Sequence, residues 1–149
     1  MNAADIAGVA VIESESPSSW PEVLLAQELE VGESIQLVAE ESGRQIVGWC
    51  ACRVIWPEAE LLKITVRKMH RKHGVGWSLL KHLLAELQKR EVASLFLEVR
   101  SKNQSALNFY AKHGFSLIGS RPNYYTDPSD SAMILKRNVP RPKIPSLGK

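Results

Sequence analysis

Apolar and polar positions follow two different periods along this chain, and together they predict a domain of mixed α/β class. A helical period predicts helices at 74–90 and at 20–30, and in the second of these Pro21 suits the first helical turn. A third, short helix is predicted at 103–113 and is ended by Gly114. Strands are predicted at 34–41, 45–56, 59–66, 94–99, 115–120 and 131–137, with a hairpin turn at 41–44.

Length and composition fit one globular domain. The chain has 149 residues, of which 44% are hydrophobic and 23% charged. We expect the domain to span 1–138 and the proline-rich segment 139–149 to be a disordered tail. No apolar run approaches the ~20 residues of a membrane span, and the N-terminus has no basic segment typical of a secretory signal.

The cysteines and histidines predict neither a disulfide nor a metal site. Cys50 and Cys52 stand two apart on one predicted strand, so they share a face and are expected to be packing residues. The four histidines show no spacing typical of paired metal ligands. A reducing, cytoplasmic setting fits this cysteine usage best.

The net charge of +3 is small, but cationic residues gather in one strip between Lys63 and His73, which contains no acidic residue. The strip leads into "RKHGVGWSLL" (71–80), a glycine-containing loop at the start of a predicted helix. Free N–H groups at a helix N-terminus bind anions, and glycine permits close approach to the main chain. The loop is not a nucleotide motif, because Leu79 replaces the third glycine of a Rossmann fingerprint and Trp77 replaces the lysine of a Walker A loop.

These residues resemble the GNAT superfamily of acetyl-CoA-dependent N-acetyltransferases, whose signature Arg/Gln-x-x-Gly-x-Gly/Ala is matched by Arg71, Gly74 and Gly76. The segments "AELLKITV", "LFLEVRSKNQSALNFYAKHGF" and "RPNYYTDPSDSAMIL" are similar, more narrowly, to RimI-type ribosomal-protein-alanine acetyltransferases. The resemblance covers 59–136 and is weak over 1–58. It departs from the family pattern after the fourth strand, where Arg67 and Lys68 stand.

The resemblance implies a mixed, mostly antiparallel central sheet flanked by helices, with acetyl-CoA bound at a splay between the fourth and fifth strands. It implies that loop amides hold the pyrophosphate and that no metal is needed. The residues that it assigns to the peptide entrance are Asn123, Tyr124 and Tyr125. Those that it assigns to the cofactor are Ile64, Thr65, Val66, Arg71, Lys72, His73, Gly74, Val75, Gly76, Trp77 and Asn103.

Glu98 interrupts the apolar strand "SLFLEV". Taken alone, it is a carboxylate that points to solvent or pairs with Arg100. It falls, however, on the family's general-base position, and Tyr110 falls on the general-acid position. An α-amine has a pKa of ~7.7–8.0, so a carboxylate can take its proton near neutral pH. A phenol can then protonate the departing thiolate, whose conjugate thiol has a pKa of ~8.5.

The sequence therefore predicts acetyl transfer to a protein N-terminal amine, and the resemblance narrows the acceptor to the N-terminal alanine of a small-subunit ribosomal protein. One alternative is acetylation of other N-termini, lysines or a small amine. Another is a catalytically silent module that binds acyl-CoA or a protein, against which the presence of Glu98 and Tyr110 argues. A nucleic-acid-binding module is a third alternative, disfavoured because the basic strip lacks interleaved stacking aromatics.

Overall fold

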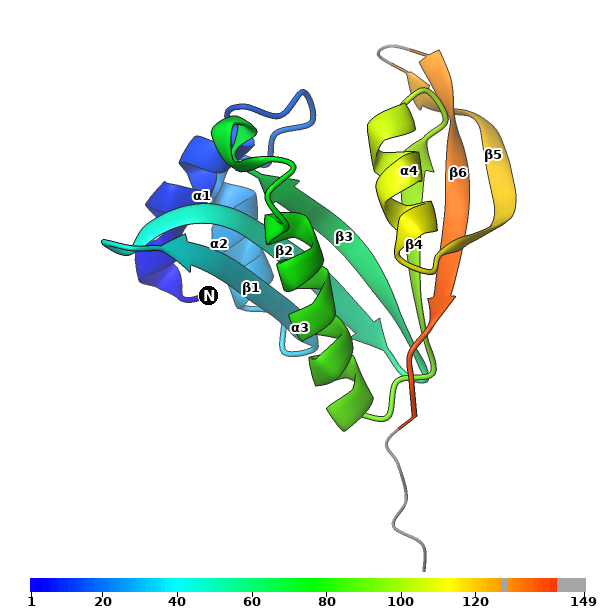
Figure 1. The fold of residues 1–149 in the computed structure, drawn as a ribbon, viewed down its shortest axis with the longest axis horizontal. Helices are drawn as coiled ribbons and strands as arrows, with labels where there is room; N and C mark the ends of the chain where they lie inside the picture. The colour runs from blue at the N-terminus through cyan, green and yellow to red at the C-terminus, as the bar shows by residue number, and fades with distance from the viewer. Residues whose placement is uncertain (127–128, 142–149) are drawn as a thin grey trace, which may run out of the picture. The chain divides into compact units, whose positions relative to one another are not determined.

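The computed structural model describes residues 1–126 and 129–141. Six strands form a mixed sheet in the order β1-β2-β3-β4-β6-β5 (Figure 1). By its internal contacts the chain divides into a first unit, 1–55 with 60–83, and a second unit, 56–59 with the residues from 84 onward.

Nearly all predicted helices and strands are confirmed, most of them within two residues of the expected bounds. The observed elements are η1 (Ala3–Asp5), α1 (Ile6–Glu13), α2 (Glu22–Leu29), β1 (Ser34–Glu41), β2 (Gln45–Ile55), β3 (Glu58–Val66), η2 (Lys68–His70), α3 (Val75–Lys89), β4 (Ser94–Arg100), α4 (Gln104–Lys112), β5 (Ser116–Thr126) and β6 (Ser129–Asn138). The largest difference in length is β5, which continues six residues beyond the predicted strand.

Helix α1 was not predicted, because the sequence "IAGVAVI" is apolar on almost every side and so shows no helical period. A local signal was nevertheless present just before it. The Asn2 side chain accepts a hydrogen bond from the Ala4 N–H at 2.9 Å, and the Asp5 carboxylate accepts one from the Asn2 N–H at 2.8 Å. This reciprocal capping box is readable in "NAAD" and marks the beginning of a helical segment.

The core of the first unit lies on both faces of β2. Val9 and Ile12 of α1 and Leu25 of α2 pack with Trp49 and Ala51, whose side chains share one face of the strand. The leucines of α3 that the sequence assigned to the core are buried as predicted: Leu79, Leu80 and Leu83 belong to the first unit, and Leu84 and Leu87 belong to the second. In Figure 1, α1 and α2 lie behind the strands of this unit and the first turns of α3 lie in front.

The two cysteines occupy neighbouring positions on the other face of β2. Neither forms a disulfide and both are buried, which confirms that they are packing residues. Burial raises the pKa of the Cys50 thiol to about 12, so this thiol stays protonated and unreactive near neutral pH.

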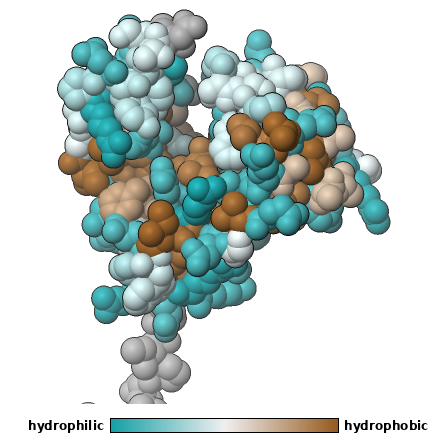
Figure 2. All heavy atoms as spheres, turned by 180° about the vertical axis from the view of Figure 1, so that it is seen from behind, coloured by the Kyte–Doolittle hydropathy of each residue, from teal (hydrophilic) through white to brown (hydrophobic). Residues whose placement is uncertain are grey.

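Helices α1 and α2 also expose apolar side chains on their outer surface. Figure 2 shows apolar atoms gathered on this part of the first unit. The exposed apolar residues of the two helices are Val11, Val23 and Leu24.

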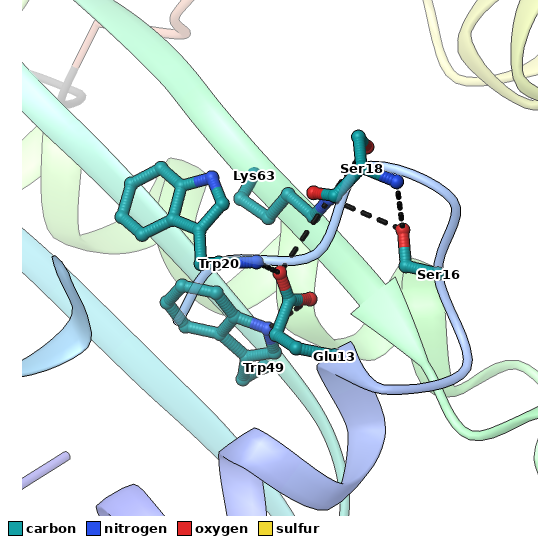
Figure 3. A network of polar contacts seen from close by, with 6 residues as sticks. All are labelled: Glu13, Ser16, Ser18, Trp20, Trp49 and Lys63. Carbon is teal, nitrogen blue, oxygen red and sulfur yellow. Dashed lines mark hydrogen bonds and ion pairs between the residues drawn. The ribbon is translucent and has the colours of Figure 1, made fainter. Parts of the chain in front are cut away.

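A buried carboxylate holds the segment that joins α1 to α2 (Figure 3). Glu13 is fully buried, and it accepts hydrogen bonds from the Trp20 N–H at 2.9 Å and from the Trp49 indole N–H at 3.1 Å. Lys63 of β3 lies 3.6 Å from the same carboxylate and donates to the Ser18 carbonyl at 2.8 Å. The T-shaped contact between the two tryptophan rings, 5.6 Å between centroids, completes the arrangement. The joining segment is therefore fixed to two strands.

In the second unit, β6 runs antiparallel to both β4 and β5. Alternate residues of β4 take different environments: Leu95, Leu97 and Val99 are buried, whereas Phe96, Glu98 and Arg100 are partly exposed. Glu98 thus belongs to the more polar face of the strand, as its position in the sequence predicted.

The chain continues beyond β6 with Val139, which belongs to the predicted tail. Val139 is buried, and its N–H donates to the Ala93 carbonyl at 3.0 Å. Most of the predicted tail, residues 142–149, lies outside the described residues.

Candidate active site

The predicted anion-binding loop follows η2 and leads directly into α3 in the first unit. Its backbone turns through two left-handed residues, Lys72 (φ 65°) and Gly74 (φ 83°). The first intrahelical hydrogen bond runs from the Ser78 N–H to the Gly74 carbonyl at 2.9 Å. The N–H groups of Val75 and Gly76 precede that bond, so helix geometry gives them no carbonyl within α3.

This backbone suits a phosphorylated ligand. The positive end of the helix dipole and the first N–H groups of α3 favour a negative charge at this point. A Cβ added at Gly74 would meet no heavy atom within 4 Å, so the main chain is approachable from that side. The residues present therefore fit the pyrophosphate that the resemblance implies.

Gly48 of β2 contacts the first turns of α3 closely. This glycine was not predicted from the sequence to be part of the site. A Cβ at this position would lie 3.0 Å from Val75 Cγ1 and 3.1 Å from Leu79 Cδ1. The glycine thus lets the helix start lie close to the strand. An isolated glycine within a strand pattern was the available signal, because such residues often mark a close backbone approach.

The end of β3 carries the residues predicted to face the pantetheine arm. Arg71 folds back so that its Nε donates to the Val66 carbonyl at 3.2 Å, which ties the loop to the strand. The Thr65 side chain is buried, and no hydrogen-bond partner for its Oγ1 exists among the described residues. A buried hydroxyl without a partner is unfavourable by roughly 1–3 kcal/mol, and an incoming polar ligand is one way to satisfy it.

A hollow of about 520 Å³ opens beside the loop, but its chemistry does not suit phosphate. Glu40 and Glu41 contribute carboxylates to its wall, and Glu41 Oε2 lies 3.1 Å from His70 Nε2. Two carboxylates disfavour an anion, so the helix amides and not this hollow fit the pyrophosphate. The lining residues are Ala39, Glu40, Glu41, Val47, Met69, His70, His73, Val75 and Ser78.

The cationic residues between Lys63 and His73 do not form one continuous basic surface in the structure, because acidic side chains lie beside two of them. Lys63 points inward to Glu13, and burial lowers the pKa of its ammonium while Glu13 opposes that shift. The Lys68 N–H donates to Glu15 Oε1 at 3.2 Å, so an acidic side chain lies at the start of η2. Because these carboxylates stand beside the strip, a continuous cationic surface for nucleic acid is not supported.

The candidate base Glu98 lies in the second unit, beside a cation that the sequence analysis missed. Its side chain is 22% exposed, and Oε1 lies 3.4 Å from Nη2 of Arg121 on β5. The two residues meet across β6, where Glu98 is in register with Ile134 and Arg121 with Ala132. The sequence offered solvent or Arg100 as the surroundings of Glu98; the Arg100 guanidinium lies 4.2 Å from the centre of the Tyr125 ring.

The predicted peptide rim lies next to Glu98. The pairing of β5 with β6 shifts register between Arg121 and Tyr125, and Asn123 is left-handed there (φ 56°). The rings of Tyr124 and Tyr125 meet edge to face at 5.1 Å between centroids. Burial and the charge of Glu98 raise the pKa of Tyr125, so its hydroxyl remains a hydrogen-bond donor near neutral pH. Such irregularities are common near active sites.

Tyr110, the candidate acid, lies on α4 of the same unit. It is 8% exposed, and its ring meets Phe109 at 5.4 Å and Phe115 at 5.2 Å between centroids. The aromatic neighbours fix the ring, as the packing of a positioned proton donor requires.

Asn103 begins α4 and has a structural task of its own. Its Oδ1 accepts the Ala106 N–H at 3.1 Å, which makes it the N-cap of the helix and leaves its NH₂ group as the donor for any ligand. The preceding turn is held by Asp130, which accepts from the Ser101 hydroxyl and from the Lys102 N–H. Sequence reasoning missed Asp130, because 29 positions separate it from Ser101.

In 1–126 and 129–141, no group of three His, Cys, Asp or Glu side chains is arranged to hold a metal ion. No helix in this part of the chain has the length and apolar character needed to cross a membrane.

Comparison with known proteins gives the family. Residues 7–115 match the family model of the acetyltransferase (GNAT) family. The [ribosomal protein bS18]-alanine N-acetyltransferase of Escherichia coli K12 is 39% identical over 93 residues, which are 61% of this chain and 63% of that relative's length. The chain thus spans less than two thirds of this relative.

Two other similarities extend over most of the chain. A putative [ribosomal protein bS18]-alanine N-acetyltransferase of Bacillus subtilis is 31% identical over 91% of this chain and 90% of its own length. The crystal structure of the ribosomal-protein-S18-alanine N-acetyltransferase from Escherichia coli superposes with a TM-score of 0.86 at 29% identity, over 100% of this chain and 96% of that one. The chain therefore belongs to the acetyltransferase (GNAT) family, and its fold is the GNAT fold expected from the sequence.

Proposed function

We propose that this protein transfers the acetyl group of acetyl-CoA to the N-terminal α-amine of a protein. The observation that carries the proposal is Glu98, a partly buried carboxylate beside the Asn123–Tyr125 segment. A base at this point meets the requirement of an amine acceptor, which reacts only after losing its proton.

Acetyl-CoA supplies the activated acetyl thioester. The amides of 72–77 and Arg71 hold its pyrophosphate, and Ile64, Thr65 and Val66 face its pantetheine arm. The observed support is the glycine loop at the start of α3 and the unsatisfied Thr65 hydroxyl. Asn103 contributes the amide NH₂ that remains after capping α4.

Glu98 takes the proton from the acceptor amine, directly or through one water molecule. Tyr110 gives a proton to the sulfur that leaves, and the contacts of its ring with Phe109 and Phe115 support this role by holding the ring in place. Asn123, Tyr124 and Tyr125 bind the first residues of an extended peptide, for which the Tyr125 hydroxyl is a hydrogen-bond donor.

The acceptor is the N-terminal alanine of a small-subunit ribosomal protein. This part of the proposal rests on relatives named as ribosomal-protein-alanine N-acetyltransferases in Escherichia coli and Bacillus subtilis. Such an acceptor places the reaction in the cytoplasm. Acetylation of other N-termini, lysines or small amines is the alternative within the same chemistry.

The proposal is tested by incubating the protein with acetyl-CoA and a panel of peptides, followed by mass spectrometry. A peptide that begins with alanine should gain one acetyl group, and its N-terminally blocked copy should gain none. Rapid acetylation of a lysine in the blocked copy would replace the N-terminal assignment with the general amine activity. Binding of acetyl-CoA without transfer to any peptide would support the silent module instead.

A further inference from the structure

We propose that Arg121 determines amine specificity, by making the acceptor site select a neutral α-amine over a cationic lysine side chain. The inference rests on the proposed function of Glu98 as the base. It deepens that function by naming the residue that sets the charge of the acceptor site.

The geometry gives Arg121 two contacts. Its guanidinium lies 3.4 Å from the Glu98 carboxylate, and it also lies 5.6 Å from the centre of the Tyr124 ring. Arg121 is 57% exposed, so solvent and an entering peptide can reach it. Contact with an aromatic face stabilises a guanidinium. Arg121 can therefore release Glu98 and remain on the predicted peptide rim.

The charges explain the selection. A lone carboxylate attracts any ammonium group, whereas the guanidinium beside Glu98 brings the charge of the pair to zero. A lysine side chain, with a pKa near ~10.4, is almost entirely ammonium at pH 7.5, but an α-amine with a pKa of ~7.7–8.0 has a large neutral fraction. The ion pair thus removes the attraction that would draw a lysine into the site. Arg100, the other nearby cation, lies over the Tyr125 ring and adds positive charge to the same rim.

The reaction itself needs no proton from Arg121. The amine nitrogen bonds to the acetyl carbon as the carbon–sulfur bond breaks, the amine proton passes to Glu98, and Tyr110 protonates the sulfur. Protonation of Glu98 removes its negative charge, so the attraction to Arg121 weakens and Tyr124 remains as the second contact. Arg121 is a specificity-determining residue, and it acts through Glu98.

The test compares Arg121→Gln, Arg121→Lys and a matched control, Arg90→Gln. Arg90 belongs to the same unit and forms an ion pair with Glu86 at 3.5 Å, so the control removes an equivalent charge away from Glu98. Two peptides are used: one begins with a free alanine and lacks lysine, and the other is N-terminally blocked and contains one lysine. The ratio of kcat/KM for the lysine peptide to that for the α-amine peptide is measured at pH 7.5.

We expect this ratio to rise about tenfold in Arg121→Gln, equivalent to about 1.4 kcal/mol, to stay near the wild-type value in Arg121→Lys, and not to change in Arg90→Gln. A purely structural role of Arg121 would lower kcat/KM for both peptides together and leave the ratio unchanged.

An unchanged ratio in a folded Arg121→Gln protein overturns the inference, as does a ratio that rises equally in Arg90→Gln. Arg121→Glu provides a second arm, because an added negative charge should raise the ratio further. Wild-type protein that acetylates neither peptide contradicts the proposed function, and the inference falls with it. The two failures are distinguishable, because only the first leaves the wild-type activity intact.

Discussion

Each unit holds a carboxylate next to a cation, and the two pairs differ in almost every other respect. In the first unit, Glu13 is fully buried and is surrounded by Lys63 and two N–H donors (Figure 3). In the second unit, Glu98 is 22% exposed and Arg121 is 57% exposed. The first pair joins α1 to β3, whereas the second joins two strands at an accessible rim.

Burial of a charged side chain does not by itself identify a catalytic group, because the more deeply buried of these two carboxylates, Glu13, has a structural environment. The partners of Glu13 occupy both of its oxygens. Because breaking a buried pair leaves an uncompensated charge, we expect Glu13 to stabilise the fold. A surface pair contributes only about 0–1 kcal/mol to stability, so Glu98 can exchange its partner for a substrate at little cost. Glu98, the more accessible of the two carboxylates, is the one for which we propose a role in the chemistry.

The largest expected effect is on turnover in the second unit. Glu98→Gln keeps the shape of the side chain but removes its basicity, so we expect turnover to fall by on the order of 10²–10⁴-fold. Single-turnover kinetics with an alanine-terminated peptide measure this loss. Acetyl-CoA affinity and the thermal midpoint should stay close to the wild-type values. Wild-type turnover in this variant would remove Glu98 from the chemistry.

The corresponding change in the first unit should act on stability. Glu13→Gln leaves the Lys63 ammonium buried without its counter-charge, so we expect the free energy of unfolding to fall by about 3–5 kcal/mol. Urea denaturation measures the change, and Glu22→Gln on the exposed start of α2 is the control.

A second substitution tests whether the unpaired charge of Lys63 causes the loss of stability. Adding Lys63→Met to Glu13→Gln removes the unpaired charge, so the double variant should recover part of the lost stability. If the double variant recovers no stability, the ion pair is not the cause of the loss. If Glu13→Gln lowers activity without lowering stability, the structural role assigned to Glu13 is wrong.

The third prediction concerns the loop at the start of α3. Gly74→Val should weaken acetyl-CoA binding about tenfold or more, because a side chain in the left-handed region costs about 1–2 kcal/mol and fills the open side of the backbone. Gly43→Val is a matched control, since Gly43 has the same φ of 83° and equally open surroundings in the β1–β2 turn. Isothermal titration calorimetry measures both dissociation constants. Equal affinity losses in the two variants would argue against a cofactor role for the loop.

The smallest effect is expected at Asp130, a carboxylate of the second unit that is held chiefly by hydrogen bonds, with a smaller contribution from the charge of Lys102. The Ser101 hydroxyl, chiefly, and the N–H groups of Lys102 and Ser131 lower its pKa from the ordinary 3.8, against the opposing effect of burial. Its contribution to stability is therefore present above about pH 4 and is lost as the pH falls through the lower, folded-state pKa.

Asp130→Asn should consequently be less stable than wild type at pH 6, and this difference should shrink as the pH falls below about 4. Thermal melting across that range measures the trend. A stability difference that is the same at every pH would assign the loss to geometry and not to charge.

The sequence predicted those parts of the fold in which one face of an element is apolar and the other polar. Helix α3 and strand β1 have such a pattern, and both were found with nearly the expected bounds. Helix α1 lacks it, because its apolar residues surround the axis and only tertiary packing decides that Val9 and Ile12 face inward. Strand β5 was predicted too short, because most of its residues are exposed and its hydrogen bonds to β6 extend it.

The candidate site divides in the same way. Three features of the site are local and could be recognised from the sequence alone. They are the glycines of the loop, Glu98 within an apolar strand and the "NYY" segment at Asn123–Tyr125. Arg121 was missed because its relation to Glu98 exists only across β6, a strand that lies between β4 and β5 in the sheet although it follows both in the sequence. Gly48 and Asp130 likewise act on segments that are distant along the chain.

Charge shows the division most clearly. The gathering of cations between Lys63 and His73 can be read from the sequence, but the acidic side chains beside Lys63 and Lys68 are known only from the folded structure. Folding directs Lys63 to Glu13 and brings Glu15, 53 positions away along the chain, to the Lys68 N–H. The physical reason is that electrostatic energy depends on distance in space and on burial, neither of which can be read from the order of residues.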